Sequence, residues 1–410
     1  MDSKVEATYN RALSAMALVG FISFLLLSIY RKPLSPVPFY GAVTFLSIVF
    51  IGYFFTGWIF PSSDKFLFIL AGFLVELGLI MLCRINIELF KRQVAFFALG
   101  VGFFILSSIL TRYFVRLELN PVYLWGITTA LLLLPLLFGV EKGGARNWLA
   151  FGGFTFQPSE LAKITFVFYL AGVVKQNKIN HFPRLAAEIL AAVGLLVLSR
   201  DLGGAMLFYL TALAVIFAAT SRLDVTAAGL FAAGIMGVLS YNLFDHVRVR
   251  IEAWLNPWQD VPGRGYQIAQ SLFAIAEGGY FGTGLGLGRP DFIPAVATDF
   301  IFSAFTEEFG FLGAAAVILM YFLLVYRGIR IALRLKDSYP ALIALGHTVM
   351  FGMQIFTIIG GVIKLIPVTG VTLPFMSYGG SSMVMSFTSL GILNGLWLQA
   401  REGETDGETA

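Results

Sequence analysis

The segment at residues 256–271, NPWQDVPGRGYQIAQS, carries a single acid among residues that favour turns. Asp260 is framed by two prolines and two glycines, which can hold a side chain in a loop without a helix. Arg250 and Arg264 lie close to it in sequence, and such cations could help to bind an anionic substrate. A solvated loop acid would show the same spacing, so both interpretations stay open.

A second candidate segment, GARNWLAFGGFTFQPSELAK, ends at Lys163. Glu160 and Lys163 are three residues apart on one predicted helical face, so they can form an ion pair. Because an apolar run follows Lys163, this pair is either a functional group at membrane depth or a simple pair near the membrane surface. Arg146 and Trp148 could present a cation and a stacking face to a phosphate or a sugar.

Further acids lie at the ends of apolar runs. Arg200 and Asp201 are expected to form a structural pair that caps the helix beginning at Asp201. Asp299 is expected in the first turn of another helix, where it favours the helix dipole. At least one of Glu307 and Glu308, about two turns deeper, should face the protein interior and find a partner.

Composition indicates what kind of protein positions these groups. Of 410 residues, 58% are hydrophobic and 13% are charged, against about 25% charged in soluble domains. The sequence therefore predicts a polytopic, all-α membrane protein. The net charge of +4 is spread over short loops, which argues against a nucleic-acid partner. Glu76 is also predicted within the membrane, and the sequence assigns it no role.

Metal and disulfide chemistry have little support in the sequence. One cysteine, Cys83, excludes an internal disulfide and a cysteine-based metal site. The three histidines are far apart and show no ligand spacing. No cofactor is evident and no metal ligand is assigned, although a divalent cation could still assist a pyrophosphate group.

Runs of about 20 apolar residues predict twelve membrane helices. They lie at residues 12–30, 38–60, 66–85, 93–111, 121–140, 159–174, 185–199, 201–220, 225–243, 301–326, 341–363 and 381–399. The runs at 159–174 and 185–199 are short or polar-ended and could be tilted or broken. The first run is predicted to be retained rather than cleaved as a signal peptide. The acidic tail, 401–410, is expected to be disordered.

Three connections stand out at Glu141–Pro158, from Asp245 to about Phe300, and at Lys364–Gly380. The last is too apolar for a water-filled loop and too rich in proline and glycine for a straight helix, so it could be re-entrant. Twelve spans would place both termini on one side and these connections on the other. The distribution of lysine and arginine favours cytoplasmic termini, which puts Asp260 outside the cytoplasm.

Five segments, in order along the chain, resemble the SEDS family of bacterial elongation, division and sporulation proteins, the RodA, FtsW and SpoVE group. They read GARNWLAFGGFTFQPSELAK, RDLGGAM, RIEAWLNPWQDVPGRGYQIAQSLFAIAEGGYFGTGLGLG, TDFIFSAFTEEFGFLG and LIPVTGVTLPFMSYGGSS. The resemblance implies a ten-helix core at 66–400 with a large extracytoplasmic loop at 244–300 between the ninth and tenth of the twelve helices. Residues 1–65 would then form an added N-terminal tail and transmembrane hairpin, and 401–410 a cytoplasmic tail.

The resemblance also implies an activity. Family members polymerise lipid II into glycan strands outside the bacterial cytoplasmic membrane, together with a class B penicillin-binding protein that cross-links them. It implies that Asp260 is the essential carboxylate of the large loop and that Glu160 and Lys163 are the conserved acid and base of SELAK. Val261, inserted before the usual proline, and the missing acid before TDFIF depart from the family pattern.

These residues suggest a mechanism in which Asp260 removes the proton from an attacking sugar hydroxyl. Arg146, Lys163 and Arg250 would stabilise the pyrophosphate leaving group, with Trp148 and Glu160 lining the substrate site and Asp201, Asp299 and Glu307 supporting it. Two alternatives remain at this point. The chain could be a lipid II flippase with Lys163, Glu160 and Asp201 along the path, or a scaffold that only recruits a transpeptidase.

Overall fold

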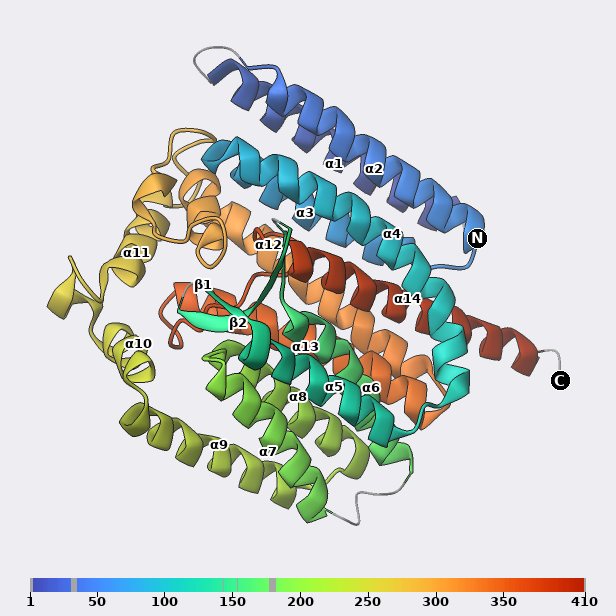
Figure 1. Cartoon of the computed structure of the whole chain (residues 1–410). Coiled ribbons are helices and arrows are strands. Elements are labelled where there is room, and N and C mark those ends of the chain that lie inside the picture. The colour runs from blue at the N-terminus through green and yellow to red at the C-terminus, as the bar shows by residue number, and fades with distance from the viewer. Residues whose placement is uncertain (1–2, 31–34, 143, 153, 177–181, 409–410) are drawn as a thin grey trace. The chain divides into compact units, whose positions relative to one another are not determined.

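The computed structural model describes residues 3–30, 35–142, 144–152, 154–176 and 182–408, and these are helical almost throughout. Figure 1 shows the long helices and one small sheet. The helices are α1 Ser3–Tyr30, α2 Val37–Ile59, α3 Lys65–Ile85, α4 Ile87–Leu117, α5 Pro121–Phe138, α6 Pro158–Lys175, α7 Phe182–Leu198, α8 Leu202–Thr220, α9 Leu223–Leu243, α10 Asp245–Leu255, α11 Tyr266–Gly278, α12 Ile301–Arg334, α13 Ser338–Val362 and α14 Gly380–Glu408.

All twelve predicted apolar runs coincide with helices in the described residues. Nine of these helices are long and apolar enough to cross a membrane, and they are α1–α5, α8, α9, α12 and α13. The two runs expected to be short, at α6 and α7, form continuous helices of 18 and 17 residues. The chain is therefore a multi-pass membrane protein of nearly all-helical fold.

The structure differs from the sequence predictions at three places. The connection after α5 folds into three short antiparallel strands, β1 Val140–Lys142, β2 Ala145–Phe151 and β3 Phe154–Phe156, in the order β1-β2-β3. The long connection after α9 contains α10, α11 and two short 3₁₀ turns, η2 Pro257–Asp260 and η3 Pro290–Phe292. α14 continues to Glu408 through the segment expected to be disordered, because an existing helix adds residues without needing a buried face.

The chain forms two compact units. The first unit comprises residues 1–112, 273–327 and 372–410, and the second comprises 113–272 and 328–371. In the first unit the α1–α2 hairpin packs against α3, whose apolar residues are almost all buried. Asp64 caps α3 by accepting a hydrogen bond from the Phe66 backbone N–H at 3.2 Å, and its other oxygen pairs with Arg327 at 2.8 Å.

The second unit is built around α6, α8 and α13, which pack on one another, with α5 against α6 and α7 against α8. α5 and α6 come together where Gly172 faces the Pro121 ring, at a spacing that leaves no room for a larger side chain. Pro121 and Pro158 stand in the first turns of α5 and α6, where a missing N–H costs nothing. The Gly172 contact lies near the C-terminal end of α6, whereas Glu160 and Lys163 lie at its N-terminal end.

Between Val362 and Gly380 the structure has neither helix nor strand. In the first unit, the part of this segment from Leu373 to Ser377 is buried. Its backbone finds partners within the protein, for example the Tyr321 hydroxyl, which donates to the Pro374 carbonyl at 2.6 Å. Irregular backbone of this kind is tolerated at membrane depth where protein surrounds it, in agreement with the re-entrant interpretation.

Candidate functional site

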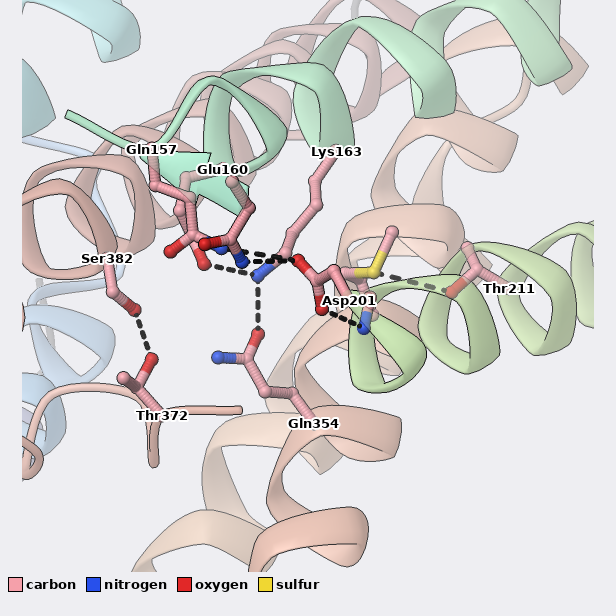
Figure 2. Close-up of polar contacts among 11 residues, drawn as sticks. Gln157, Glu160, Lys163, Asp201, Thr211, Gln354, Thr372 and Ser382 are labelled. Atoms are coloured by element: carbon pink, nitrogen blue, oxygen red, sulfur yellow. Dashed lines mark hydrogen bonds and ion pairs between the residues drawn. The ribbon is translucent and has the colours of Figure 1, made fainter. Parts of the chain in front are cut away.

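Lys163 lies at the centre of a buried polar cluster near the start of α6. Its Nζ donates to Glu160 Oε1 at 2.9 Å and to Gln354 Oε1 of α13 at 3.1 Å (Figure 2). The side chains of Lys163 and Glu160 are only 12% and 8% exposed. The predicted ion pair is therefore present. Gln354 was not predicted, although a polar residue inside the apolar run of α13 is a signal that could have identified it.

Asp201 anchors a second set of polar side chains in the same unit. Its Oδ1 accepts the Gly204 backbone N–H at 2.8 Å, which caps α8 as predicted. Its Oδ2 accepts from Asn147 at 3.1 Å and from Gln157 at 3.3 Å, and Figure 2 shows Gln157 beside Glu160. Asp201 thus joins the sheet, the start of α6 and α8. Neither amide partner was predicted from the sequence.

Arg200, just before Asp201, has a different role from the one expected. Its backbone has a left-handed φ of 61°, and its guanidinium is 3.8 Å from the Glu141 carboxylate rather than paired with Asp201. A left-handed conformation at a residue with a side chain costs on the order of 1 kcal/mol and is concentrated at functional sites.

Arg146 and Trp148, the two proposed substrate-binding residues of β2, differ in their exposure, which the sequence could not predict. Arg146 is exposed, and its Nε donates to the Gly139 carbonyl at 3.0 Å while its backbone N–H donates to the Ser199 carbonyl at 3.0 Å. Trp148 is half-buried. β2 is therefore tied to the segment before Asp201, with the Arg146 guanidinium at the surface.

The first half of the long connection is attached to residues 362–369 through side chains. Arg250 Nη1 donates to the Thr369 carbonyl at 2.9 Å, and Trp254 Nε1 donates to the Lys364 carbonyl at 3.1 Å. Ser271 Oγ donates to the Val362 carbonyl at 2.9 Å. Arg250 therefore already has a protein partner, so its proposed contact with a pyrophosphate would use its remaining donors.

Asp260 itself stabilises a local turn. Its Oδ2 accepts the Arg264 backbone N–H at 3.0 Å, and its backbone carbonyl accepts from Gly263 and Gly265 at 3.2 and 3.0 Å. The residue is exposed, and the Arg264 guanidinium is paired with Glu252 at 3.0 Å. Val261 adopts an ordinary helical conformation within this turn, so the inserted residue is accommodated without strain.

Asp299 belongs to a segment of the first unit that is fixed by backbone hydrogen bonds. Tyr378 N–H donates to the Ala297 carbonyl at 2.8 Å, and Ser377 Oγ donates to the Thr298 carbonyl. Ala295, at the start of this turn, has a φ of 53°, and Phe375 on the other side of the contact has a φ of 67°. Asp299 is half-buried and precedes the start of α12 by two residues.

Glu307 and Glu308 are both buried, at 5% and 1% exposure, and both have partners. Glu307 Oε1 accepts the Arg289 backbone N–H at 2.7 Å, and Glu308 Oε2 accepts the Gly286 backbone N–H at 2.9 Å. Arg84 Nε lies 3.4 Å from Glu308 Oε1. The expectation that at least one acid faces the interior is confirmed.

Glu76 of α3 is fully buried, and neither of its carboxylate oxygens has a hydrogen-bond partner within the described parts of the chain. It lies against Gly20 of α1 so closely that a Cβ there would be 2.0 Å from Glu76 Oε1. Across residues 3–30, 35–142, 144–152, 154–176 and 182–408, no group of three histidine, cysteine or acidic side chains could hold a metal ion.

Comparison with known proteins gives a consistent result. The model of the FtsW, RodA and SpoVE family, described as cell cycle proteins, matches residues 64–402. The chain is 38% identical over 369 residues to the peptidoglycan glycosyltransferase RodA of Mycobacterium tuberculosis, covering 81% of this chain and 77% of that one. It is 37% identical over 357 residues to the stage V sporulation protein E of Bacillus subtilis, covering 81% and 96% of the two chains.

Two solved structures are similar along most of the chain. One, from work on the structural coordination of polymerization and crosslinking by a peptidoglycan synthase complex, aligns with a TM-score of 0.70 at 30% identity, covering 83% of this chain and 98% of that one. The crystal structure of Thermus thermophilus RodA aligns with a TM-score of 0.61 at 29% identity, covering 83% and 97%. Because the family match extends over most of the sequence, the chain belongs to the FtsW, RodA and SpoVE family of cell cycle proteins.

Proposed function

We propose that this chain is a peptidoglycan glycosyltransferase that polymerises lipid II into glycan strands at the outer face of the bacterial cytoplasmic membrane. The observation that carries the proposal is the buried cluster of Lys163, Glu160 and Gln354 at the start of α6, within a chain whose family relatives bear that enzymatic name. Both termini would then be cytoplasmic, and the connection after α9 would be largely extracytoplasmic.

The reaction joins a sugar hydroxyl to the anomeric carbon of a second sugar and expels a lipid-linked pyrophosphate. A carboxylate takes the hydroxyl proton as the bond forms, and a single displacement inverts the anomeric configuration. Cations stabilise the charge that develops on the leaving pyrophosphate. Lys163 is the best-placed cation, because a polar cluster orients it in a buried environment where its charge acts strongly.

Asp260 is the base that the sequence suggests, and its local contacts bear on that role. One carboxylate oxygen accepts the Arg264 N–H and the side chain is exposed to solvent. The turn therefore holds the carboxylate in place and leaves it accessible to a substrate hydroxyl, as a general base requires.

The contacts around Asp299 fit the supporting role proposed for it. Hydrogen bonds from Ser377 and Tyr378 hold the backbone just before it, and the strained residues Ala295 and Phe375 lie on either side of that contact. We infer that Asp260 is the general base, as the sequence suggests, and that Asp299 supports the segment that leads into α12.

The experiment is reconstitution of the full chain in liposomes with its transpeptidase partner, a class B penicillin-binding protein, and labelled lipid II. Glycan polymer marks the enzyme, lipid translocation without polymer marks a flippase, and neither marks a scaffold. The structural neighbour that coordinates polymerization and crosslinking supports including the partner. Addition of EDTA tests whether a divalent ion, carried by the pyrophosphate, assists the reaction.

Lys163→Met tests the cation in the same assay. The change leaves the Glu160 carboxylate buried without its ion-pair partner, so both stability and polymer formation should fall. The double variant Glu160→Gln with Lys163→Met removes the unpaired charge and should recover stability while polymer formation stays low. Full activity in that double variant would contradict a catalytic role for Lys163.

A further inference from the structure

α12 is interrupted within its membrane-spanning length. Gly310 has a φ of 67° and a ψ of −172°, which no helical residue adopts. It lies nine residues after Ile301, or roughly 13 Å along the axis at 1.5 Å per residue. The hydrocarbon core is about 30 Å thick, so the break falls at membrane depth, where unpaired backbone groups are costly.

The loop after α11 supplies the partners that the interrupted helix lacks. Four backbone hydrogen bonds join residues 279–284 to residues 307–312. They run from Phe311 N to Gly279 O at 2.8 Å, Leu312 N to Tyr280 O at 3.2 Å, Thr283 N to Glu307 O at 2.9 Å and Gly284 N to Glu308 O at 3.0 Å. The loop therefore lies beside the break and follows it to the same depth.

Two glycines permit this close approach. A Cβ on Gly310 would be 2.2 Å from the Gly282 nitrogen, and a Cβ on Gly282 would be 2.2 Å from the Glu308 carbonyl oxygen. Both atoms belong to the backbone and cannot move aside. The two backbones are therefore in direct contact, as expected where one segment supplies hydrogen-bond partners to backbone groups that the break in the other leaves unpaired.

Buried acids hold the returning part of the same loop. Glu308 and Glu307 accept the backbone N–H groups of Gly286 and Arg289, and Arg84 Nη2 donates to the Gly288 carbonyl at 3.1 Å. These anchors are on the protein side of the loop. The tip of the loop carries two large side chains, those of Tyr280 and Phe281.

The tip of the loop exposes a continuous apolar surface. Tyr280 and Phe281 are 75% and 83% exposed, and Phe311 and Leu312 of α12 are 58% and 55% exposed. The Tyr280 and Phe311 rings make an edge contact with centroids 6.3 Å apart. The surface continues along α12 at Ile318, Leu319 and Phe322, which are also exposed on this membrane-spanning helix.

We propose that residues 278–284 form a re-entrant turn that enters the bilayer, with the Tyr280 and Phe281 side chains against lipid acyl chains. A large exposed aromatic surface would be unfavourable in water but not in hydrocarbon, where only unpaired polar groups are costly. The occupant is lipid because the residues of this surface are uncharged and continue onto the exposed apolar side of α12, a helix long and apolar enough to cross a membrane. The long connection therefore returns into the membrane before α12 begins.

Spin labelling of the full chain in liposomes tests this placement. A nitroxide is attached at Phe281→Cys in a background in which the single cysteine is replaced, Cys83→Ala. Leu319→Cys, on the exposed membrane-spanning side of α12, and Asp291→Cys, at an exposed polar position, provide the references. Collisions with oxygen report lipid exposure, and collisions with a water-soluble nickel complex report water exposure.

At position 281 we expect oxygen accessibility similar to that at 319 and nickel accessibility at least about fivefold lower than at 291, because polar solutes are excluded from hydrocarbon. High nickel accessibility would place the turn in water and overturn the proposal. Low accessibility to both probes would show that protein covers it, which also overturns it. Tyr280→Cys repeats the measurement at a second position, and polymer formation by each labelled variant confirms that it is folded.

Discussion

The two halves of the connection between α9 and α12 are held in different ways. The first half, at residues 245–272, is attached by side chains, since Arg250, Trp254 and Ser271 donate to backbone carbonyls of the segment after α13. The second half, at 273–300, is attached by its backbone, which bonds to α12 at one end and to residues 377–378 at the other.

The difference has a physical consequence. Side-chain anchors can release and re-form with little rearrangement, whereas a backbone ladder constrains every residue along it. The second half is therefore expected to be the more rigid of the two, and the first half, which carries the proposed base Asp260, suits a loop that admits a bulky substrate.

The largest expected effect is on catalysis. Asp260→Asn should reduce the rate of polymer formation by about 10²–10⁴-fold, the usual contribution of a general base. The turn itself should persist, because an amide oxygen can still accept the Arg264 N–H that orders it. Asp299→Asn, at the supporting position in the second half, should reduce the rate less. The measurement is polymer formed from labelled lipid II by each purified variant with its partner. The opposite ranking would move the base to the second half and contradict this assignment.

The next effect concerns the backbone attachment itself. Gly310→Ala forces a left-handed residue with a side chain into contact with the Gly282 backbone, which should lower stability by about 1–3 kcal/mol from conformational strain alone. Thermal unfolding in detergent measures the loss. Gly102→Ala in α4 is the matched control, because nothing lies within 4 Å of its added Cβ. If both variants unfold at the wild-type temperature, the backbone contact is not a constraint.

A smaller effect is expected in the first half. Arg250→Met removes one hydrogen bond to the Thr369 carbonyl, a change of about 1.5 kcal/mol for a charged donor. Hydrogen exchange should become faster in α10 and stay unchanged at residues 279–300. Trp254→Phe, which removes the indole donor to Lys364, is the companion variant and should act on the same segment. Faster exchange throughout both halves would show that they do not respond separately.

The smallest effect is one of pH. Burial, followed by repulsion from Arg250 and Arg200, holds the pKa of the His246 imidazole in α10 below its usual range. The folded state therefore favours neutral His246. Above the unfolded-state pKa of about 6.5 the imidazole is neutral in both states, so the stability of the fold does not change with pH. Below it the unfolded state takes up the proton more readily, so stability falls. Protection of α10 amides should decrease between pH 7.5 and 5.5. His246→Gln should abolish that pH dependence, and a decrease that persists in this variant would assign it to other groups.

Much of this architecture could be predicted from the sequence. Apolar runs located twelve helices, because hydrocarbon admits only long stretches whose backbone bonds are satisfied internally. The three-residue spacing of Glu160 and Lys163 predicted their ion pair, since positions i and i+3 share a helical face. The capping role of Asp201 followed from its position before an apolar run.

The tertiary structure decided what local pattern could not. Gln354 joins Lys163 across 191 positions of sequence, and Asn147 joins Asp201 across 54, so no spacing rule could connect them. The same limit applies to the loop beside the break in α12. Its hydrogen bonds join backbone groups, which nearly all residue types share, so the sequence does not mark them. Sequence thus determined where the long apolar helices and the local pairs lie. Only the packing of segments distant in sequence decided which side chains meet Lys163 and Asp201 and which backbone groups pair across the break in α12.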